Sequence, residues 1–210
     1  MYLNGLCFIT ARKESSLTLK EIVAIILSSG VRCIQYREKD KSRRDLYREA
    51  LLLRKLTTEF GAIFIVNDYA DIALAVNADG VHLGQSDLPL KEAREILGNK
   101  KIIGISTHSI EEAIAAGAGG ADYIGFGPIF HTATKDAGKP KGIAALREIK
   151  KIIKIPVVAI GGIKAENLES VIDSGADAVA VSSGILKGNI SENIRRFLKS
   201  SLQRKSDCLI

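Results

Sequence analysis

The amino-acid sequence predicts an α/β protein built as a single (β/α)8 TIM barrel. Short apolar runs rich in β-branched residues alternate strictly with amphipathic helical patterns, and eight of each can be counted. Such alternation indicates a parallel sheet with crossover helices. Eight repeats favour closure into a barrel, because an open doubly wound sheet more often stops at about five or six strands. No linker or low-complexity segment divides the chain, so we expect one domain over 1–210, with a flexible tail from about 203.

Eight segments have the length and composition of buried strands. Each is a short apolar run that ends at glycine or at polar residues, which is typical of strands in a parallel sheet. In chain order they are 6–10, 33–37, 63–66, 80–83, 102–106, 123–126, 157–160 and 178–181. In such barrels the active site lies at the carboxyl ends of the strands, so the residues that follow each run are the candidates for function.

The segments between these strands have apolar residues at helical spacing. They are 19–28, 44–60, 69–78, 89–97, 110–116, 143–153, 167–174 and 191–202. Gly30 and Gly175 follow two of these helices, where a left-handed residue closes the last turn. Similar phrases that contain Asp79, Asp122 and Asp177 lead into later strands, so the joints from helix to strand resemble one another.

Composition limits the classes of protein that the chain can belong to. Hydrophobic residues make up 46% and charged residues 26%, which is ordinary for a globular protein with one substantial core. No apolar run approaches the roughly 20 residues that cross a bilayer, and the N-terminus lacks the pattern of a signal peptide. We therefore expect a cytoplasmic protein with no membrane partner. Cys7, Cys33 and Cys208 lack metal-ligand spacing and predict neither a disulfide framework nor a zinc site.

The net charge of +6 could indicate a nucleic-acid partner. With no Trp and few aromatic residues for base stacking, we expect none. A basic mouth that binds small phosphorylated substrates fits the charge better. Exposed barrel helices commonly associate, so a homo-oligomer stays open.

Two carboxylates follow adjacent predicted strands. Asp68 comes just after the run 63–66, and Asp87 lies shortly after the run 80–83. Adjacent parallel strands lie about 4.8 Å apart, so both acids should emerge side by side at one edge. Two carboxylates there could share Mg²⁺, which takes one or two protein carboxylates together with water and phosphate oxygens. Alternatively, Asp68 caps the next helix and Asp87 belongs to a turn.

The second strand ends in a charged segment. Alternation places Gln35, Arg37 and Lys39 on one side of it, with Tyr36 and Glu38 between them. Cations on this side would open into the mouth and meet an anion, because burying them unpaired inside a barrel would cost several kcal/mol. The alternative is an ion pair of Arg37 with an acidic neighbour on the rim.

The later strands end in small and hydroxyl residues. Ser106 ends the fifth strand, where it either caps a helix or faces the site, and His108 is expected to be structural or exposed. After the sixth strand, two hydroxyls and a lysine form a donor-rich loop that suits phosphate, and 136–142 resembles a mobile lid or an ordinary surface loop. Loops after the last two strands recurrently bind phosphate in these barrels. The residues concerned are Thr132, Ala133, Thr134, Lys135, Gly162, Ser182 and Ser183.

Taken together, these segments resemble the thiamine-phosphate synthase family. The matching phrases span nearly the whole chain in order: Gln35 to Lys39, Val66 to Asp68, Gly80 to Asp87, Gly104 to Ser106, Gly125 to Phe130, Thr132 to Lys135 and Gly161 to Ile163. The resemblance implies a Mg²⁺-dependent transferase. The pyrimidinylmethyl group of 4-amino-2-methyl-5-hydroxymethylpyrimidine diphosphate would pass to a thiazole phosphate, giving thiamine phosphate and pyrophosphate.

The resemblance also implies a role for each matching residue. Metal would be held by Asp68 and Asp87. The pyrimidine diphosphate would be bound by Gln35, Tyr36, Arg37, Glu38, Lys39, Asn67, Ser106 and Lys135, of which Arg37, Lys39, Ser106 and Lys135 would be catalytic. The thiazole phosphate would be bound by Thr132, Ala133, Thr134, Gly162, Ser182 and Ser183. His131 stands where the family varies, and it is given no role.

Two rival functions share the predicted barrel. A thiazole tautomerase of the same superfamily isomerises rather than couples, and that branch has a histidine where this chain has Pro128. A regulatory, non-catalytic barrel would be expected to lack part of the diphosphate-binding set. Asp68, Asp87 and Lys135 are all present here, which favours the transferase.

Overall fold

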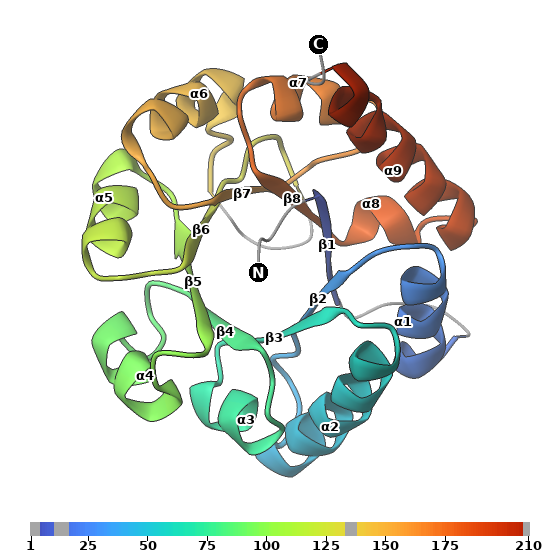
Figure 1. The fold of residues 1–210 in the computed structure, drawn as a ribbon, viewed down its shortest axis with the longest axis vertical. Coiled ribbons are helices and arrows are strands. Elements are labelled where there is room, and N and C mark those ends of the chain that lie inside the picture. Colours follow the sequence, from blue (N-terminus) through green and yellow to red (C-terminus); the bar gives the residue numbers. More distant parts are fainter. Residues whose placement is uncertain (1–4, 11–16, 133–137, 208–210) are drawn as a thin grey trace.

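The computed structural model describes residues 5–10, 17–132 and 138–207, and it confirms the (β/α)8 barrel. Eight parallel strands follow one another around a closed barrel, and β1 pairs with β8 to complete it. Figure 1 shows the helices as an outer ring around the strands. The strands are β1 Gly5–Ile9, β2 Cys33–Tyr36, β3 Ile63–Asn67, β4 Gly80–Leu83, β5 Ile102–Thr107, β6 Tyr123–Phe126, β7 Val157–Ile160 and β8 Ala178–Val181.

The helices lie where the apolar periodicity predicts them. They are α1 Leu19–Ser28, α2 Arg43–Glu59, α3 Ala70–Ala75, α4 Leu90–Leu97, α5 Ile110–Ala118, α6 Gly142–Ile152, α7 Leu168–Asp173, α8 Ser183–Leu186 and α9 Ile190–Asp207. The short helix α8 was not predicted, because four residues are too few to show a period. Helix α3 ends early, and Asn77 just beyond it has a left-handed backbone with φ 52°. Flexibility of the tail from about 203 stays a prediction.

Apolar side chains form two separate packed regions. The larger region lies between the strands and the surrounding helices and contains residues such as Phe8, Phe64 and Leu146. The smaller one fills the interior of the barrel and includes Cys7, Cys33, Tyr123, Val158 and Ala180. Successive strand residues alternate between these regions, so a polar residue in phase with the inner set points toward the barrel axis.

Two glycines leave room for large side chains inside the barrel. A Cβ atom on Gly104 in β5 would lie 2.0 Å from Cζ of Tyr123, and one on Gly125 in β6 would lie 3.0 Å from Cε1 of His82. Both rings are buried. The close approach explains why these two interior positions, one in β5 and one in β6, carry no side chain.

Three aspartates fasten the amino-terminal ends of the strands. Each carboxylate accepts a hydrogen bond from a backbone N–H of the preceding strand and pairs with a basic side chain of the helix before that strand, at distances of 2.6–2.8 Å. The sets are Asp79 with Phe64 N–H and Arg54, Asp122 with Ile103 N–H and Arg94, and Asp177 with Val157 N–H and Lys150. This explains the similar joints in the sequence.

We expect Asp79→Ala to lower the free energy of unfolding by about 2 kcal/mol, because Phe64 N–H and Arg54 both lose their partner. Denaturant titration followed by circular dichroism measures this change. Glu148→Ala is the control, since it removes an exposed ion pair with Lys151 and should cost less than about 0.5 kcal/mol. Equal stability losses in the two variants would contradict the fastening role.

Candidate active site

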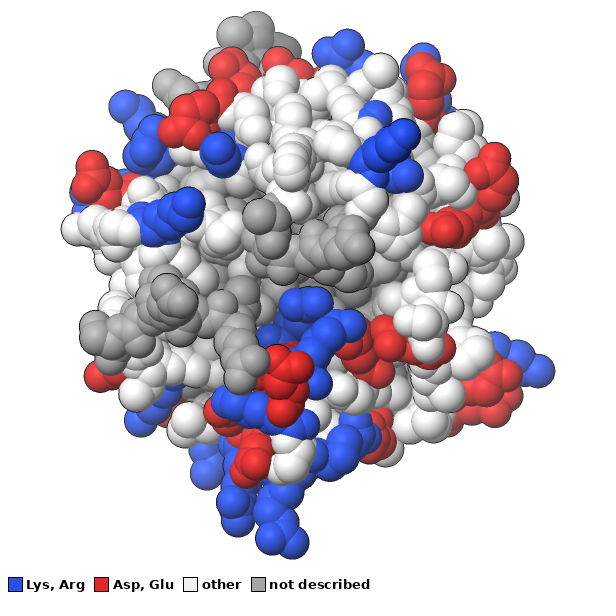
Figure 2. All heavy atoms as spheres, turned by 180° about the vertical axis from the view of Figure 1, so that it is seen from behind, with Lys and Arg blue, Asp and Glu red and all other residues white. Residues whose placement is uncertain are grey.

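Charged side chains gather at the end of the barrel where the strands finish. Figure 2 views this end, and Lys and Arg side chains lie near its centre with Asp and Glu beside them. Among the described residues, no helix has both the length and the hydropathy needed to span a membrane.

Asp68 and Asp87 lie next to each other at the ends of β3 and β4. Their carboxyl groups are close enough to share a hydrogen bond. Asp68 has a left-handed backbone with φ 67°, and its N–H donates to the carbonyl of His82 at 2.8 Å. Asp87 accepts the Gly84 N–H at 2.6 Å. The predicted proximity of the two acids is thus found, and Asp87 also closes a turn.

The alternative role of Asp68 as a helix cap is not found. The residue that precedes α3 is Tyr69, and it makes no side-chain capping hydrogen bond. The Asp68 carboxylate instead faces Asp87 and Lys39, whose Nζ lies 3.5 Å from Oδ2. Only 13% of the Asp68 side chain is exposed.

This arrangement makes Asp68 an unusual acid. Burial and the adjacent Asp87 raise the pKa of Asp68 to about 6, although Lys39 partly opposes the shift. A divalent cation between the two carboxylates would remove the repulsion. No described group of three or more His, Cys, Asp or Glu residues forms a metal cluster. Two adjacent carboxylates are a ligand set that could hold Mg²⁺, which needs only one or two protein carboxylates.

A chain of amide hydrogen bonds holds Asp68 from the neighbouring strands. Gln35 in β2 donates from Nε2 to Oδ1 of Asn67 at 2.7 Å, and Asn67 donates from Nδ2 to the Asp68 carboxylate. Gln35 and Asn67 are both buried. Because the Asn67 Oδ1 accepts from Gln35, the Asn67 Nδ2 is directed at the Asp68 carboxylate, and the orientation of that carboxylate is set before any ligand arrives.

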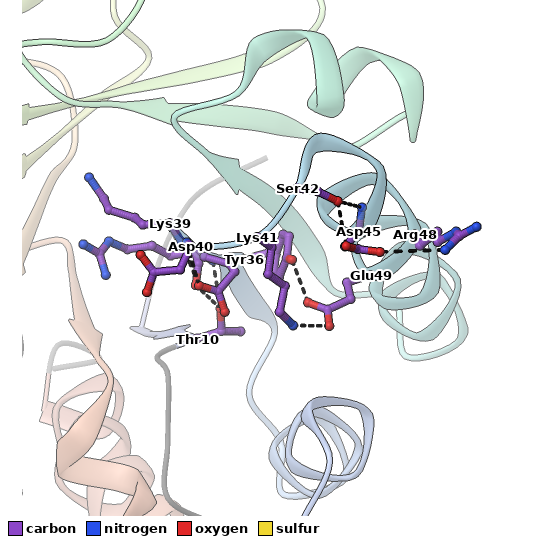
Figure 3. Close-up of polar contacts among 11 residues, drawn as sticks. Thr10, Tyr36, Lys39, Asp40, Lys41, Ser42, Asp45, Arg48 and Glu49 are labelled. Atoms are coloured by element: carbon purple, nitrogen blue, oxygen red, sulfur yellow. Dashed lines mark hydrogen bonds and ion pairs between the residues drawn. The ribbon is translucent and has the colours of Figure 1, made fainter.

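The loop after β2 is anchored on both sides, as Figure 3 shows. Thr10 Oγ1 donates to the Arg37 carbonyl at 3.0 Å and accepts the Arg37 N–H at 2.8 Å, which joins the ends of β1 and β2. Glu38 accepts the backbone N–H groups of Lys39 and Asp40 at 2.8 and 3.2 Å. Glu38 thus stabilises the turn, and Lys39 extends away from α2.

Tyr36 is placed differently from its sequence neighbours. Its hydroxyl donates to Glu49 of α2 at 2.8 Å, and its side chain is buried in the helix-facing region. Lys41 also pairs with Glu49 (Figure 3). Tyr36 was predicted to contact the substrate with Gln35 and Arg37, but alternation turns it toward the helix layer, where it supports the loop.

Ser106 belongs to a buried polar line that sequence reasoning did not single out. Its Oγ lies 2.8 Å from Nε2 of His82, and His82 Nδ1 lies 2.9 Å from the Tyr123 hydroxyl. Gln85 donates to the Ser106 carbonyl at 2.6 Å. The available signal was the position of His82, in phase with the inner residues of β4. His108 precedes α5, contacts Glu112 of that helix through its backbone N–H and its ring, and lies outside this line.

The ends of β7 and β8 form a second group of predicted residues. Gly161 and Gly162 have positive φ values of 95° and 66°, and a Cβ on Gly162 would lie 2.5 Å from the carbonyl oxygen of His131. Ser182 Oγ is buried and has no hydrogen-bond partner among the described residues. Such an orphan hydroxyl is a place for a ligand, because unpaired buried polar atoms are costly.

The remaining predicted residues are those of the loop after β6 and Ser183, which begins α8. Thr132 is described and half-buried, and Ser183 is exposed. Ala133, Thr134 and Lys135 lie outside the described residues, as does the start of the predicted lid. The end of that loop is fixed by hydrogen bonds from Lys141 N–H to the Pro128 carbonyl at 2.7 Å and from Gly142 N–H to the Ile129 carbonyl at 3.0 Å.

Comparison with known proteins adds independent information. The family model described as thiamine monophosphate synthase matches residues 6–185. Thiamine-phosphate synthase of Methanosarcina barkeri is 48% identical over 190 residues, which cover 88% of this chain and 86% of that protein. The enzyme of the same name from Clostridium acetobutylicum is 47% identical over 180 residues, with 86% and 85% covered.

A solved structure is also similar. Thiamine phosphate pyrophosphorylase from Pyrococcus furiosus superposes with a TM-score of 0.87 and 39% identity, covering 95% of this chain and 96% of that one. The similarity therefore extends over the barrel as a whole and includes the strand ends that carry the acidic pair and its amide partners. From the family model and these relatives, we conclude that the chain belongs to the thiamine monophosphate synthase family.

Proposed function

We propose that this protein synthesises thiamine phosphate. The pyrimidinylmethyl group would pass from 4-amino-2-methyl-5-hydroxymethylpyrimidine diphosphate to the ring nitrogen of a thiazole phosphate. The carbon–oxygen bond to the diphosphate breaks and pyrophosphate leaves with the electron pair, while the nitrogen lone pair forms the new carbon–nitrogen bond. Family membership supports this reaction. The observation that carries it is the paired carboxylates of Asp68 and Asp87, held beside Lys39 at the mouth of the barrel.

The central demand of this reaction is to stabilise a leaving diphosphate. Mg²⁺ bound by Asp68 and Asp87 would supply charge neutralisation worth several kcal/mol. Arg37 and Lys39 emerge from the anchored loop after β2 and would bind the diphosphate oxygens, together with Lys135. Asn67 donates a hydrogen bond to the Asp68 carboxylate and so fixes its orientation. A site of cations and oriented acids suits departure of an anion.

The organic part of the substrate would lie deeper in the mouth. Gln35 lies near the carboxyl end of β2 and Ser106 near that of β5, with β3 and β4 between them, and both would bind the pyrimidine. Tyr36 and Glu38 support the loop after β2. Departure of pyrophosphate leaves a stabilised pyrimidinylmethyl cation, which the thiazole nitrogen captures directly. No protein nucleophile or strong base is needed, which is consistent with the hydroxyl and amide character of these side chains.

The thiazole phosphate would bind across the ends of β6, β7 and β8. The buried hydroxyl of Ser182, which has no partner among the residues that the structure describes, is the best support for an anion there, because a phosphate oxygen would accept its hydrogen. Gly162, Ser183 and Thr132 would complete the pocket, with Ala133 and Thr134 from the loop after β6. We expect Ser182→Ala to raise KM for the thiazole phosphate about tenfold without changing KM for the diphosphate.

Steady-state kinetics with one substrate varied at a time measures the effect of Ser182→Ala. Ser170→Ala is a matched control, because the Ser170 hydroxyl donates to a carbonyl within its own helix turn and is exposed. A selective rise in KM for the pyrimidine diphosphate would mean that the two pockets are reversed.

The direct test of the function is to mix the protein with both substrates and Mg²⁺. We expect release of pyrophosphate in equal amount to thiamine phosphate, and loss of both products when a chelator removes the metal. Isomerised thiazole without pyrophosphate would instead identify a tautomerase, and absence of any turnover would favour a regulatory barrel. We also infer a cytoplasmic location for this chemistry, which cell fractionation would check.

A further inference from the structure

Two buried side chains and one partly exposed side chain form a hydrogen-bonded line beneath the mouth of the barrel. Tyr123 of β6, His82 of β4 and Ser106 of β5 are joined by contacts of 2.9 and 2.8 Å through the two ring nitrogens of His82. The His82 and Tyr123 rings lie 5.4 Å apart with a tilt of 32°. Only Ser106, at the upper end of the line, is partly exposed to the mouth.

The Tyr123 end of the line sets the direction of its hydrogen bonds. Burial raises the pKa of Tyr123 well above its ordinary value, so the hydroxyl keeps its proton. Within the part of the chain that the structure describes, the hydrogen-bond partner of this hydroxyl is Nδ1 of His82. A buried O–H without an acceptor would cost about 1–3 kcal/mol. The tyrosine therefore donates, and Nδ1 of His82 carries no hydrogen.

The rest of the line follows from the chemistry of neutral imidazole. One ring nitrogen of a neutral histidine accepts and the other carries the hydrogen. With Nδ1 accepting from Tyr123, Nε2 carries the hydrogen and donates to Oγ of Ser106. The Ser106 hydroxyl then has its own hydrogen available for a ligand at the mouth.

Two glycines, Gly104 and Gly125, leave space for the side chains of this line. The Gly104 position would bring a Cβ within 2.5 Å of the Tyr123 hydroxyl, and the Gly125 position would bring one within 3.4 Å of His82 Nε2. Both glycines have ordinary backbone angles among the residues of β5 and β6, so turn geometry does not explain them. Glycine is needed at these positions because a side chain there would overlap the ring of Tyr123 or His82.

We propose that Tyr123 and His82 are positioning residues that make Ser106 a committed hydrogen-bond donor toward the pyrimidine diphosphate. The ligand atom opposite Ser106 is then an acceptor, such as a ring nitrogen or an oxygen of the leaving group, and not an amino group. The identity of the ligand rests on the proposed function. The direction of the two hydrogen bonds that join Tyr123, His82 and Ser106 does not.

The hydrogen positions can be measured without any substrate. The chain has three histidines, so ¹⁵N spectra of histidine-labelled protein contain few ring signals, and His82→Gln identifies those of His82. We expect the neutral form with hydrogen on Nε2, and a mixture of both neutral forms in Tyr123→Phe. Hydrogen on Nδ1 in the unaltered protein, or no change in Tyr123→Phe, would overturn the proposal.

Kinetics distinguish positioning from simple packing. The amide nitrogen of Gln reaches roughly the place of Nε2, whereas that of Asn reaches only the place of Nδ1. We expect kcat/KM for the pyrimidine diphosphate to fall about tenfold in Tyr123→Phe and in His82→Gln, and about a hundredfold in His82→Asn. KM for the thiazole phosphate should stay within about twofold throughout.

The outcomes separate this proposal from the proposed function. Equal losses in His82→Gln and His82→Asn, or losses that follow thermal stability alone, would refute positioning while coupling activity of the unaltered protein remains. Failure of the unaltered protein to couple the two substrates would refute the proposed function. The ¹⁵N spectra would still show which groups donate and which accept in the hydrogen bonds of Tyr123, His82 and Ser106.

Discussion

Asp68→Asn is expected to lower kcat about a thousandfold while the barrel remains folded. The change removes one of the two carboxylates that would hold Mg²⁺, and the loss falls on stabilisation of the leaving diphosphate, so extra substrate should not restore turnover. Asn is the suitable replacement because Asp68 has φ 67°, a left-handed conformation that Asn tolerates well. Pyrophosphate release at saturating substrates and Mg²⁺ is the measurement.

Asp71→Asn is the matched control for Asp68→Asn. Asp71 lies three residues further on, is exposed and pairs with Arg43 on the surface. The control should keep nearly full activity. Near-normal coupling in Asp68→Asn itself would remove the metal assignment.

Thermal unfolding in chelator provides a second readout for Asp68→Asn. Because the folded-state pKa of Asp68 is raised from 3.8 to about 6, its ionisation destabilises the folded protein as pH rises through that interval. Asn has no such ionisation. The melting temperature of the variant relative to the unaltered protein should therefore increase between about pH 4 and pH 7. A constant difference would mean that the pKa of Asp68 is not raised in the folded protein.

Gly104→Ala is expected to destabilise the barrel by about 3 kcal/mol, equivalent to a melting temperature lower by about 10 °C. The new methyl group would lie 2.0 Å from Cζ of Tyr123, and that ring is enclosed inside the barrel and cannot move aside freely. Differential scanning calorimetry measures the change. Coupling activity should also fall, because a displaced Tyr123 no longer orients His82.

Two further variants test the origin of the Gly104→Ala effect. Gly117→Ala adds the same methyl group inside α5, where Cδ1 of Ile155 would lie 4.0 Å away, and it should raise stability by up to about 1 kcal/mol. Combining Gly104→Ala with Tyr123→Leu should recover part of the lost stability by removing the ring. No recovery in the double variant would show that the cost lies elsewhere in β5.

Much of this structure follows from simple sequence periodicity. Strand runs and their sharp polar ends predicted the barrel and brought Asp68 and Asp87 to neighbouring strand ends. Lys39 was correctly placed near the same end, because charge inside a packed barrel is costly and must emerge at a mouth. The catalytic and binding roles of these residues remain predictions that the variants above can test.

Other features could not be read from local patterns. Alternation alone would have separated Tyr36 from Gln35, yet a shared sequence phrase grouped them. His82 was missed because its partners, Ser106 and Tyr123, lie 24 and 41 residues away in the chain. The length of α3 depends on left-handed residues at Asp68 and Asn77, and only the packed structure reveals those conformations.

The aspartate fasteners at the opposite end of the barrel recur at every second strand, before β4, β6 and β8. The barrel can thus be regarded as a ring of two-strand units. Three of these units contain the same aspartate hydrogen bond between their strands. Duplication of an ancestral module would leave such a trace. Because these aspartate contacts lie at the end of the barrel opposite the candidate active site, the loops at the site could change in sequence without disturbing them.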